Sequence, residues 1–153
     1  MLSPGDVAPD VRYTTAEGVE ATVADHKGRK LVLYFYPKSF TSVCTEEAHL
    51  FAETTEEFAA LGASVIGVSG DDIETQRKFS ASECRDKFAV GADADRAVMK
   101  AYDVGGRSPY AARVSYVISP ESRILSVVSS AEAQPHIRGA LDTLRALQAG
   151  RRS

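Results

Sequence analysis

The sequence lacks a long hydrophobic run and is poor in cysteine, and these two shortages exclude whole classes of protein. Its longest strictly apolar run is 31–36, whereas a membrane-spanning helix needs about 20 such residues. The two cysteines, Cys44 and Cys84, lie 40 positions apart. They are too few for a disulfide scaffold and do not form a Cys-x-x-Cys pair. The sequence therefore predicts neither a membrane protein nor a small disulfide-rich domain.

The sequence also lacks a strong net charge and a metal-binding pattern. Its net charge of −3 gives no electrostatic reason to expect nucleic acid or an anionic membrane as partner. His26, His49 and His136 show no metal-ligand spacing relative to the cysteines, so we expect no metal and no cofactor. No signal peptide is visible at the N-terminus. We therefore expect a cytoplasmic protein, and a periplasmic one if a signal peptide has been removed.

The remaining composition is that of one globular domain. The chain has 153 residues, of which 44% are hydrophobic and 25% charged, and these are ordinary values for a folded domain. A chain of this length can bury one sizeable core, and no linker or repeat divides it. We therefore expect a single domain over 1–153.

The pattern of apolar residues predicts an α/β domain with a mixed central sheet and helices on both faces. Predicted strands are 11–14, 19–23, 31–36, 63–69, 113–119 and 123–129, and predicted helices are 45–61, 72–83, 94–102 and 132–148. Strand 31–36 is apolar on both faces, as central strands are. It forms a right-handed βαβ unit with 45–61 and 63–69, which predicts two parallel neighbours. The first two and the last two strands are short-turn hairpins.

Cys44 falls where this topology predicts a reactive group. Ligands of α/β sheets bind at the carboxyl ends of strands, where loops lead into helices, and 37–45 is such a loop. Cys44 is then in the first turn of the helix, where unpaired backbone N–H groups and the helix dipole favour a thiolate. The thiolate is the nucleophilic form of cysteine. A buried core cysteine is the alternative interpretation.

Two acids beside Cys44 work against a thiolate. Glu46 and Glu47 follow it closely, and nearby negative charge disfavours an anionic sulfur. We expect both to be exposed acids that stabilise the helix start; the alternative for Glu47 is that it orients part of the pocket. A reactive Cys44 then needs a cation from elsewhere in the fold. Arg113, at the start of a later strand, is the best candidate because its planar fork can hold two partners at once; Lys38 and Arg107 are weaker ones.

Pro37, Thr41 and Cys44 reproduce a Pro-x-x-x-Thr-x-x-Cys motif, and here the sequence resembles the peroxiredoxins. The surrounding YFYPKSFTSVCTEEA resembles the bacterioferritin comigratory protein (PrxQ) subfamily. Four further segments agree in order, namely GDVAPD, VIGVSGDD, GADADRAVMKAYDV and RVSYVISPESRIL. The resemblance covers nearly the whole chain and implies a thioredoxin-like fold, in agreement with the architecture predicted above.

The resemblance implies a role for each residue of the motif. Cys44 matches the peroxidatic cysteine, which attacks the O–O bond of hydrogen peroxide or an organic hydroperoxide and becomes a sulfenic acid. Thr41 matches the threonine whose hydroxyl contacts the thiolate and the peroxide, and Pro37 the proline that shields the sulfur from water. Arg113 matches the arginine that completes the pocket. Without the resemblance, Thr41 would be a helix N-cap and Arg113 a surface charge.

The resemblance also implies how the sulfenic acid is reduced. Many relatives carry a resolving cysteine five positions after the peroxidatic one, but here that residue is His49, which we expect to be a packing or solvated histidine. Other members place the cysteine in the next helix, where Cys84 stands. We therefore expect an intrachain Cys44–Cys84 disulfide, reduced by thioredoxin or a similar dithiol, and a monomer rather than a dimer. If Cys84 only packs, the enzyme uses an external thiol.

Two other functional classes stay open from the residues alone. A thioredoxin-like disulfide reductase would need a cysteine three positions after Cys44, where Glu47 stands. A non-catalytic binding or chaperone module could use the same fold, because fold does not determine function. Such a module would leave the group Pro37, Thr41, Cys44 and Arg113 without an explanation.

Overall fold

The computed structural model describes residues 1–23, 29–83, 87–93, 96–105 and 111–152. The strands are β1 (Arg12–Thr15), β2 (Glu20–Thr22), β3 (Lys30–Phe35), β4 (Ala63–Ser69), β5 (Ala89–Ala92), β6 (Val114–Ile118) and β7 (Ile124–Ser129). The helices are α1 (Ser42–Glu53), α2 (Thr55–Ala60), α3 (Ile73–Ser82), α4 (Ala97–Ala101) and α5 (Gln134–Arg152). None of the helices in these ranges is both long and apolar enough to cross a membrane.

The seven strands of the described chain form one mixed sheet in the order β2-β1-β5-β4-β3-β6-β7. β3, β4 and β5 are parallel neighbours, and the other pairs are antiparallel. The predicted βαβ unit and both predicted hairpins are therefore confirmed. The sheet brings the carboxyl end of β3, which leads to Cys44, next to the amino end of β6.

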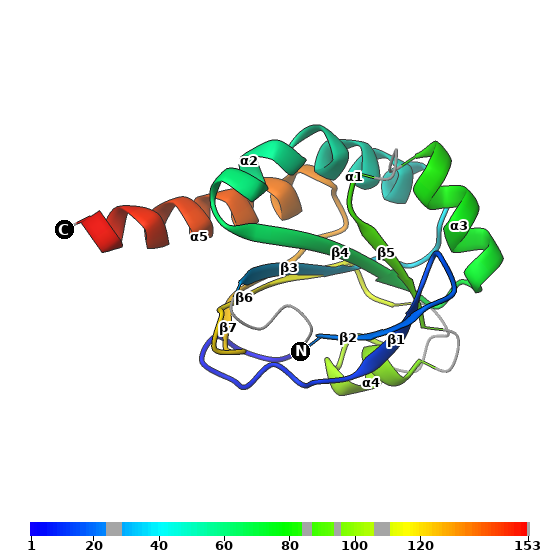
Figure 1. The fold of residues 1–153 in the computed structure, drawn as a ribbon, viewed down its shortest axis with the longest axis horizontal. Helices are drawn as coiled ribbons and strands as arrows, with labels where there is room; N and C mark the ends of the chain where they lie inside the picture. Colours follow the sequence, from blue (N-terminus) through cyan, green and yellow to red (C-terminus); the bar gives the residue numbers. More distant parts are fainter. Residues whose placement is uncertain (24–28, 84–86, 94–95, 106–110, 153) are drawn as a thin grey trace.

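Helices cover both faces of this sheet, as the sequence predicts (Figure 1). The even-numbered side chains Val32 and Tyr34 of β3 belong to a core shared with α1, α2, α3 and α5. The odd-numbered Leu31, Leu33 and Phe35 belong to a second core on the other face, which contains α4. Every residue of β3 is buried, because a strand has side chains on two faces and both are covered.

The predicted helix 45–61 is wrong in two respects. It begins earlier, at Ser42, and it divides into α1 and α2 at Thr54. The Thr54 hydroxyl donates to the carbonyl of Leu50 at 2.8 Å, and the Thr55 hydroxyl to that of Phe51 at 3.0 Å. Such side-chain bonds compete with the backbone bonds that would continue a helix.

The sequence did not predict β5, and it misplaced the ends of two helices. β5 has the sequence Ala-Val-Gly-Ala, which has little intrinsic strand propensity; pairing with β1 and β4 on its two sides makes it a strand. The helix predicted over 94–102 is described only over Ala97–Ala101. The last helix starts two residues later than predicted and continues to Arg152.

Candidate active site

Cys44 lies in the first turn of α1, and the chain segment that follows β3 leads to it. Thr41 is the N-cap residue, in an extended conformation, and its carbonyl accepts from the backbone N–H of Thr45 at 2.9 Å. Cys44 is therefore the third residue of the helix, where the backbone N–H groups lack partners within the helix. Its side chain is almost completely buried, with 1% of the residue exposed.

Arg113 contacts the sulfur from the neighbouring strand. β6 pairs antiparallel with β3 so that Val114 lies opposite Phe35, and this register places Arg113 beside the segment that leads to Cys44. The guanidinium donates from Nη2 to Cys44 Sγ at 3.3 Å and from Nη1 to Glu47 Oε1 at 2.7 Å. Burial works against its charge, but Glu47 and Cys44 together raise the pKa of Arg113. The cation that the sequence required is thus in contact with the sulfur.

The prediction for Glu47 is wrong. It is not an exposed acid: it is completely buried, and among the two acids beside Cys44 only Glu46 is exposed. Because Glu47 follows Cys44 by three positions, both side chains lie on one face of α1 and meet Arg113 there. Burial raises the pKa of Glu47 to about 8, although Arg113 opposes this shift. Burial thus favours the neutral form of the carboxyl, which competes less with Cys44 for the positive charge of Arg113 than a carboxylate would.

A buried histidine that the sequence did not single out lies behind Glu47. His136 of α5 is completely buried, and its Nε2 donates to the Ser130 carbonyl at 2.9 Å. Its Nδ1 lies 2.7 Å from Ser115 Oγ and 3.8 Å from Glu47 Oε2. Burial lowers the pKa of His136, so the neutral ring accepts the Ser115 hydroxyl proton at Nδ1. No spacing in the sequence connects His136 with Glu47; the contact exists only because α5 packs on α1.

We expect the protonated state of Glu47 to be measurable as a pH dependence of stability. A carboxyl whose pKa is higher in the folded state binds a proton that the unfolded chain has lost, so stability falls as pH rises from about 4.5 to about 8. For one group, the slope is at most about 1.4 kcal/mol per pH unit. Glu47→Gln keeps a neutral acceptor for Arg113 and should remove this slope. The measurement is urea unfolding of both proteins between pH 5 and 9; parallel curves would contradict the assignment.

The other predicted site residues lie around the same segment. The Thr41 side chain is exposed, and its hydroxyl donates to the Lys38 carbonyl at 2.8 Å. Pro37 is half-buried. It lines a hollow of about 500 Å³ together with Arg113 and residues 129–131, which gives a small oxidant a place beside the guanidinium. Lys38 is exposed. Cys84 and Arg107 lie outside the residues that the structure describes.

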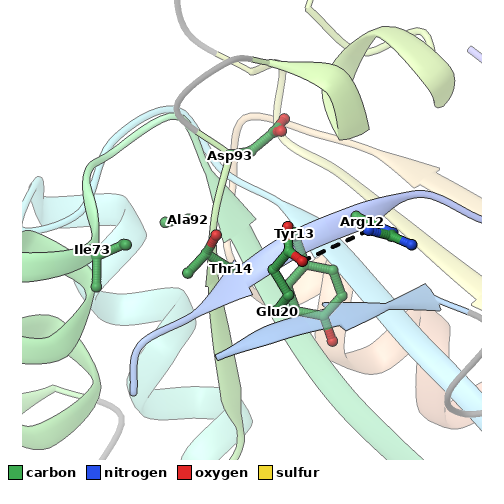
Figure 2. A pocket seen from close by; sticks show the side chains of 7 residues that line it. All are labelled: Arg12, Tyr13, Thr14, Glu20, Ile73, Ala92 and Asp93. Atoms are coloured by element: carbon green, nitrogen blue, oxygen red, sulfur yellow. Dashed lines mark ion pairs between the residues drawn. The ribbon is translucent and has the colours of Figure 1, made fainter. Parts of the chain in front are cut away.

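A second hollow, of about 270 Å³, lies between the β1–β2 hairpin and the start of α3 (Figure 2). It shares no lining residue with the hollow beside Arg113. Its charged groups serve the fold: Arg12 pairs with Glu20 at 3.7 Å. The Asp93 carboxylate accepts from the first backbone N–H groups of α4. The charged groups of this hollow thus have partners within the fold, and Cys44 with Arg113 stays the candidate site.

The chain is similar to known proteins over most of its length. A profile of the AhpC/TSA family matches residues 4–127. The Peroxiredoxin Bcp of Bacillus subtilis is 33% identical over 148 residues, which cover 92% of this chain and 94% of the relative.

Solved structures are similar over nearly the whole chain. The peroxidoxin BcpB of Mycobacterium tuberculosis superposes with a TM-score of 0.89 at 30% identity and covers 95% of this chain and 98% of its own. The bacterioferritin comigratory protein of Xanthomonas campestris, whose structures concern alkyl peroxide reduction, has a TM-score of 0.78 at 28% identity, with 89% and 90% covered. The predicted thioredoxin-like fold is confirmed.

Proposed function

Because the chain belongs to the AhpC/TSA family and is a peroxiredoxin of the Bcp and PrxQ type, we propose that Cys44 is the thiol that attacks the peroxide. The protein is a thiol peroxidase, an oxidoreductase that needs a peroxide and a reductant. One observation carries the assignment of Cys44: its sulfur accepts a hydrogen bond from Arg113 at 3.3 Å in the first turn of a helix. A cation and unpaired helix amides together favour a thiolate.

The attack transfers one oxygen atom to the sulfur. A hydroperoxide enters the hollow beside Pro37 and Arg113 with its O–O bond in line with Sγ. The sulfur lone pair forms the S–O bond and the O–O electron pair leaves with the second oxygen, which takes a proton and departs as water or an alcohol. Arg113 and the N–H groups of Val43 and Cys44 stabilise the charge on the leaving oxygen. The Thr41 hydroxyl lies at the same N-terminal end of α1, because Thr41 is the N-cap residue of this helix.

The reductant then returns Cys44 to the thiol. We propose that Cys84 attacks the sulfenic acid, releases water and forms an intrachain disulfide, which thioredoxin or a similar dithiol reduces. The resemblance and the position of Cys84 in the sequence, two residues after the end of α3, support this step. The alternative is a direct attack by an external thiol. A monomeric state and a cytoplasmic location also stay predictions, and sedimentation would test the first.

Intact-mass analysis after one equivalent of peroxide separates these routes. We expect the wild type to lose about 2 Da as a disulfide and Cys84→Ser to gain about 16 Da as a sulfenic acid. Peroxide consumption with a thioredoxin system should accompany the first result. If Cys84→Ser behaves as the wild type does, Cys84 has no part in the mechanism; if neither protein changes mass, the assignment of Cys44 fails.

A further inference from the structure

Two buried acids share a single cation in the candidate active site. Arg113 donates from Nη2 to Cys44 Sγ at 3.3 Å and from Nη1 to Glu47 Oε1 at 2.7 Å. Cys44 is 1% exposed and Glu47 is completely buried. Charges in such a place interact strongly, because little water screens them. The protonation state of one acid therefore depends on that of the other.

The three groups are balanced when one of the two acids is ionised. If both acids lost their protons, the buried site would hold an excess negative charge, and if both kept them, the guanidinium would have no anion. An uncompensated buried charge is strongly unfavourable in either case. Cys44 and Glu47 therefore titrate as a coupled pair that carries a single negative charge. Of the described residues, Arg113 and His136 face the Glu47 carboxyl with nitrogen atoms, at 2.7 and 3.8 Å from its oxygens.

His136 indicates which oxygen of Glu47 holds a proton. Its Nε2 lies 2.9 Å from the Ser130 carbonyl, which can only accept, so Nε2 carries the hydrogen. Burial and the charge of Arg113 lower the pKa of His136, so the ring is neutral and Nδ1 presents a lone pair. Glu47 Oε2 lies 3.8 Å from Nδ1 and has no hydrogen-bond partner among the described residues. A carboxylate oxygen would be repelled there, whereas an O–H group on Oε2 would be attracted.

The packing of α5 on α1 keeps this proton on the carboxyl rather than on the imidazole. Both helices cover the same face of the sheet (Figure 1), and this arrangement places His136 against Glu47. Ser115 of β6 lies with its Oγ 2.7 Å from Nδ1 and donates to it, because Nδ1 has no hydrogen. The lone pair of Nδ1 is thus already in use. Glu47 keeps its proton as long as Arg113 has another anion.

Oxidation of Cys44 removes that other anion. The sulfur lone pair forms the S–O bond, and the product is an uncharged sulfenic acid. Of the described residues, Glu47 is then the acid that stays in hydrogen-bond contact with the guanidinium. Loss of the Glu47 proton restores a balanced pair. The oxygen that leaves the peroxide needs one proton in the same step.

We propose, on the basis of the proposed function of Cys44, that Glu47 is a positioning residue that exchanges roles with the sulfur: it is neutral while Cys44 is a thiolate and becomes the counter-ion of Arg113 when Cys44 is oxidised. The thiolate, the hydroperoxide and the protonated Glu47 become the sulfenic acid, water or an alcohol, and the Glu47 carboxylate. Sulfur is oxidised, the O–O bond breaks and the S–O bond forms. The proton that Glu47 releases matches the one that the leaving oxygen takes, so the site takes up no net proton from the solvent.

The first test follows the carboxyl carbon of Glu47 by NMR from about pH 5 to about pH 10, the range in which a raised carboxyl pKa titrates. The parent is Cys84→Ser, in which Cys44 is the single thiol. Addition of Cys44→Ser replaces the thiolate by an uncharged group. We expect the pKa of Glu47 to fall by about one to two units in that variant, because Arg113 then serves Glu47 alone. The exposed Glu46 is the matched control and should titrate alike in both proteins.

The second test counts protons during the first oxidation step. The parent is mixed with one equivalent of peroxide in weak buffer near pH 7, and an indicator dye reports the protons taken up for each sulfur oxidised. We expect an uptake close to zero in the parent. Glu47→Gln has no proton to release, so its uptake should rise to about one, which the leaving oxygen takes from the solvent. Glu46→Gln removes the exposed neighbouring acid and should behave as the parent does.

Two results would overturn the proposal. One is a Glu47 titration that is the same with and without the Cys44 sulfur. The other is equal proton uptake in the parent and in Glu47→Gln, since the negative charge would then not pass from the sulfur to Glu47. The NMR measurement needs no peroxide. If the parent consumes no peroxide while Glu47 still responds to Cys44→Ser, the proposed function of Cys44 fails and the coupling of the two acids stands.

Discussion

Replacing Cys44 by serine is expected to abolish peroxide consumption, with a loss in kcat/KM of about 10⁴-fold or more, as for other removed nucleophiles. The reason is chemical. A serine hydroxyl keeps its proton at neutral pH, even beside Arg113, and its oxygen is a far poorer nucleophile toward O–O bonds than a sulfur anion. The substitution is almost isosteric, so Arg113 and Glu47 should keep their 2.7 Å contact.

The measurement is the decay of peroxide with a dithiol reductant, followed for the wild type, Cys44→Ser and Cys84→Ser. Cys84→Ser is the matched control because it removes the same sulfur atom at the second cysteine. It should keep its first oxidation step and slow only the reduction. Thermal unfolding of Cys44→Ser should resemble that of the wild type. If Cys44→Ser consumed peroxide at the wild-type rate, Cys44 would not be the residue that attacks the peroxide. That result would contradict the proposed function.

Much of this site follows from local rules that can be applied to the sequence. An apolar run ended by Pro37 predicts a buried strand, and helix formers after it predict that Cys44 is in a first turn. Both expectations agree with the structure. Arg113 could be assigned to the pocket because of the resemblance, whereas the pairing of its strand with β3 is known only from the structure. These predictions need only periodicity, chain order and one motif.

The residues that the sequence did not place depend on packing between distant elements. Glu47 was expected at the surface because carboxylates are seldom buried without a partner, and its partner lies 66 positions away. The three-residue spacing from Cys44 was the one available signal. His136 carried no signal, because its partners Ser115 and Glu47 come from other elements. β5 owes its structure to its two neighbours in the sheet rather than to its own composition.

Arg113→Met is expected to lower kcat/KM for peroxide by about 10³-fold, the loss typical of removing a group that stabilises developing charge. Arg113 has two tasks in the structure. Its Nη2 donates to Cys44 Sγ at 3.3 Å, which favours the sulfur anion before the reaction. Its Nη1 donates to Glu47 Oε1, and this bond holds the guanidinium in place. A methionine fills a similar volume but supplies neither charge nor donors. The measurement is the rate of the first oxidation step under excess peroxide.

Arg113→Lys separates charge from geometry. A lysine restores a positive charge but has no planar fork, so it cannot contact Cys44 and Glu47 in the same two directions. We expect it to recover only part of the rate, on the order of tenfold below the wild type, because one of the two hydrogen bonds of Arg113, to Cys44 and to Glu47, is lost. Full recovery would mean that charge alone supports catalysis and that the fork has no role.

The double variant Arg113→Met with Glu47→Gln distinguishes a chemical loss from a structural one. Arg113→Met leaves the buried Glu47 Oε1 without its donor, and an unsatisfied buried acceptor costs about 1–3 kcal/mol of stability. An amide at position 47 cannot ionise, so the double variant should be more stable than Arg113→Met above pH 8. If the stability returns and the rate does not, the guanidinium acts on the reacting sulfur. If both return, Arg113 serves only as the hydrogen-bond donor of the buried Glu47 side chain, and the cation that our mechanism requires has to come from another residue.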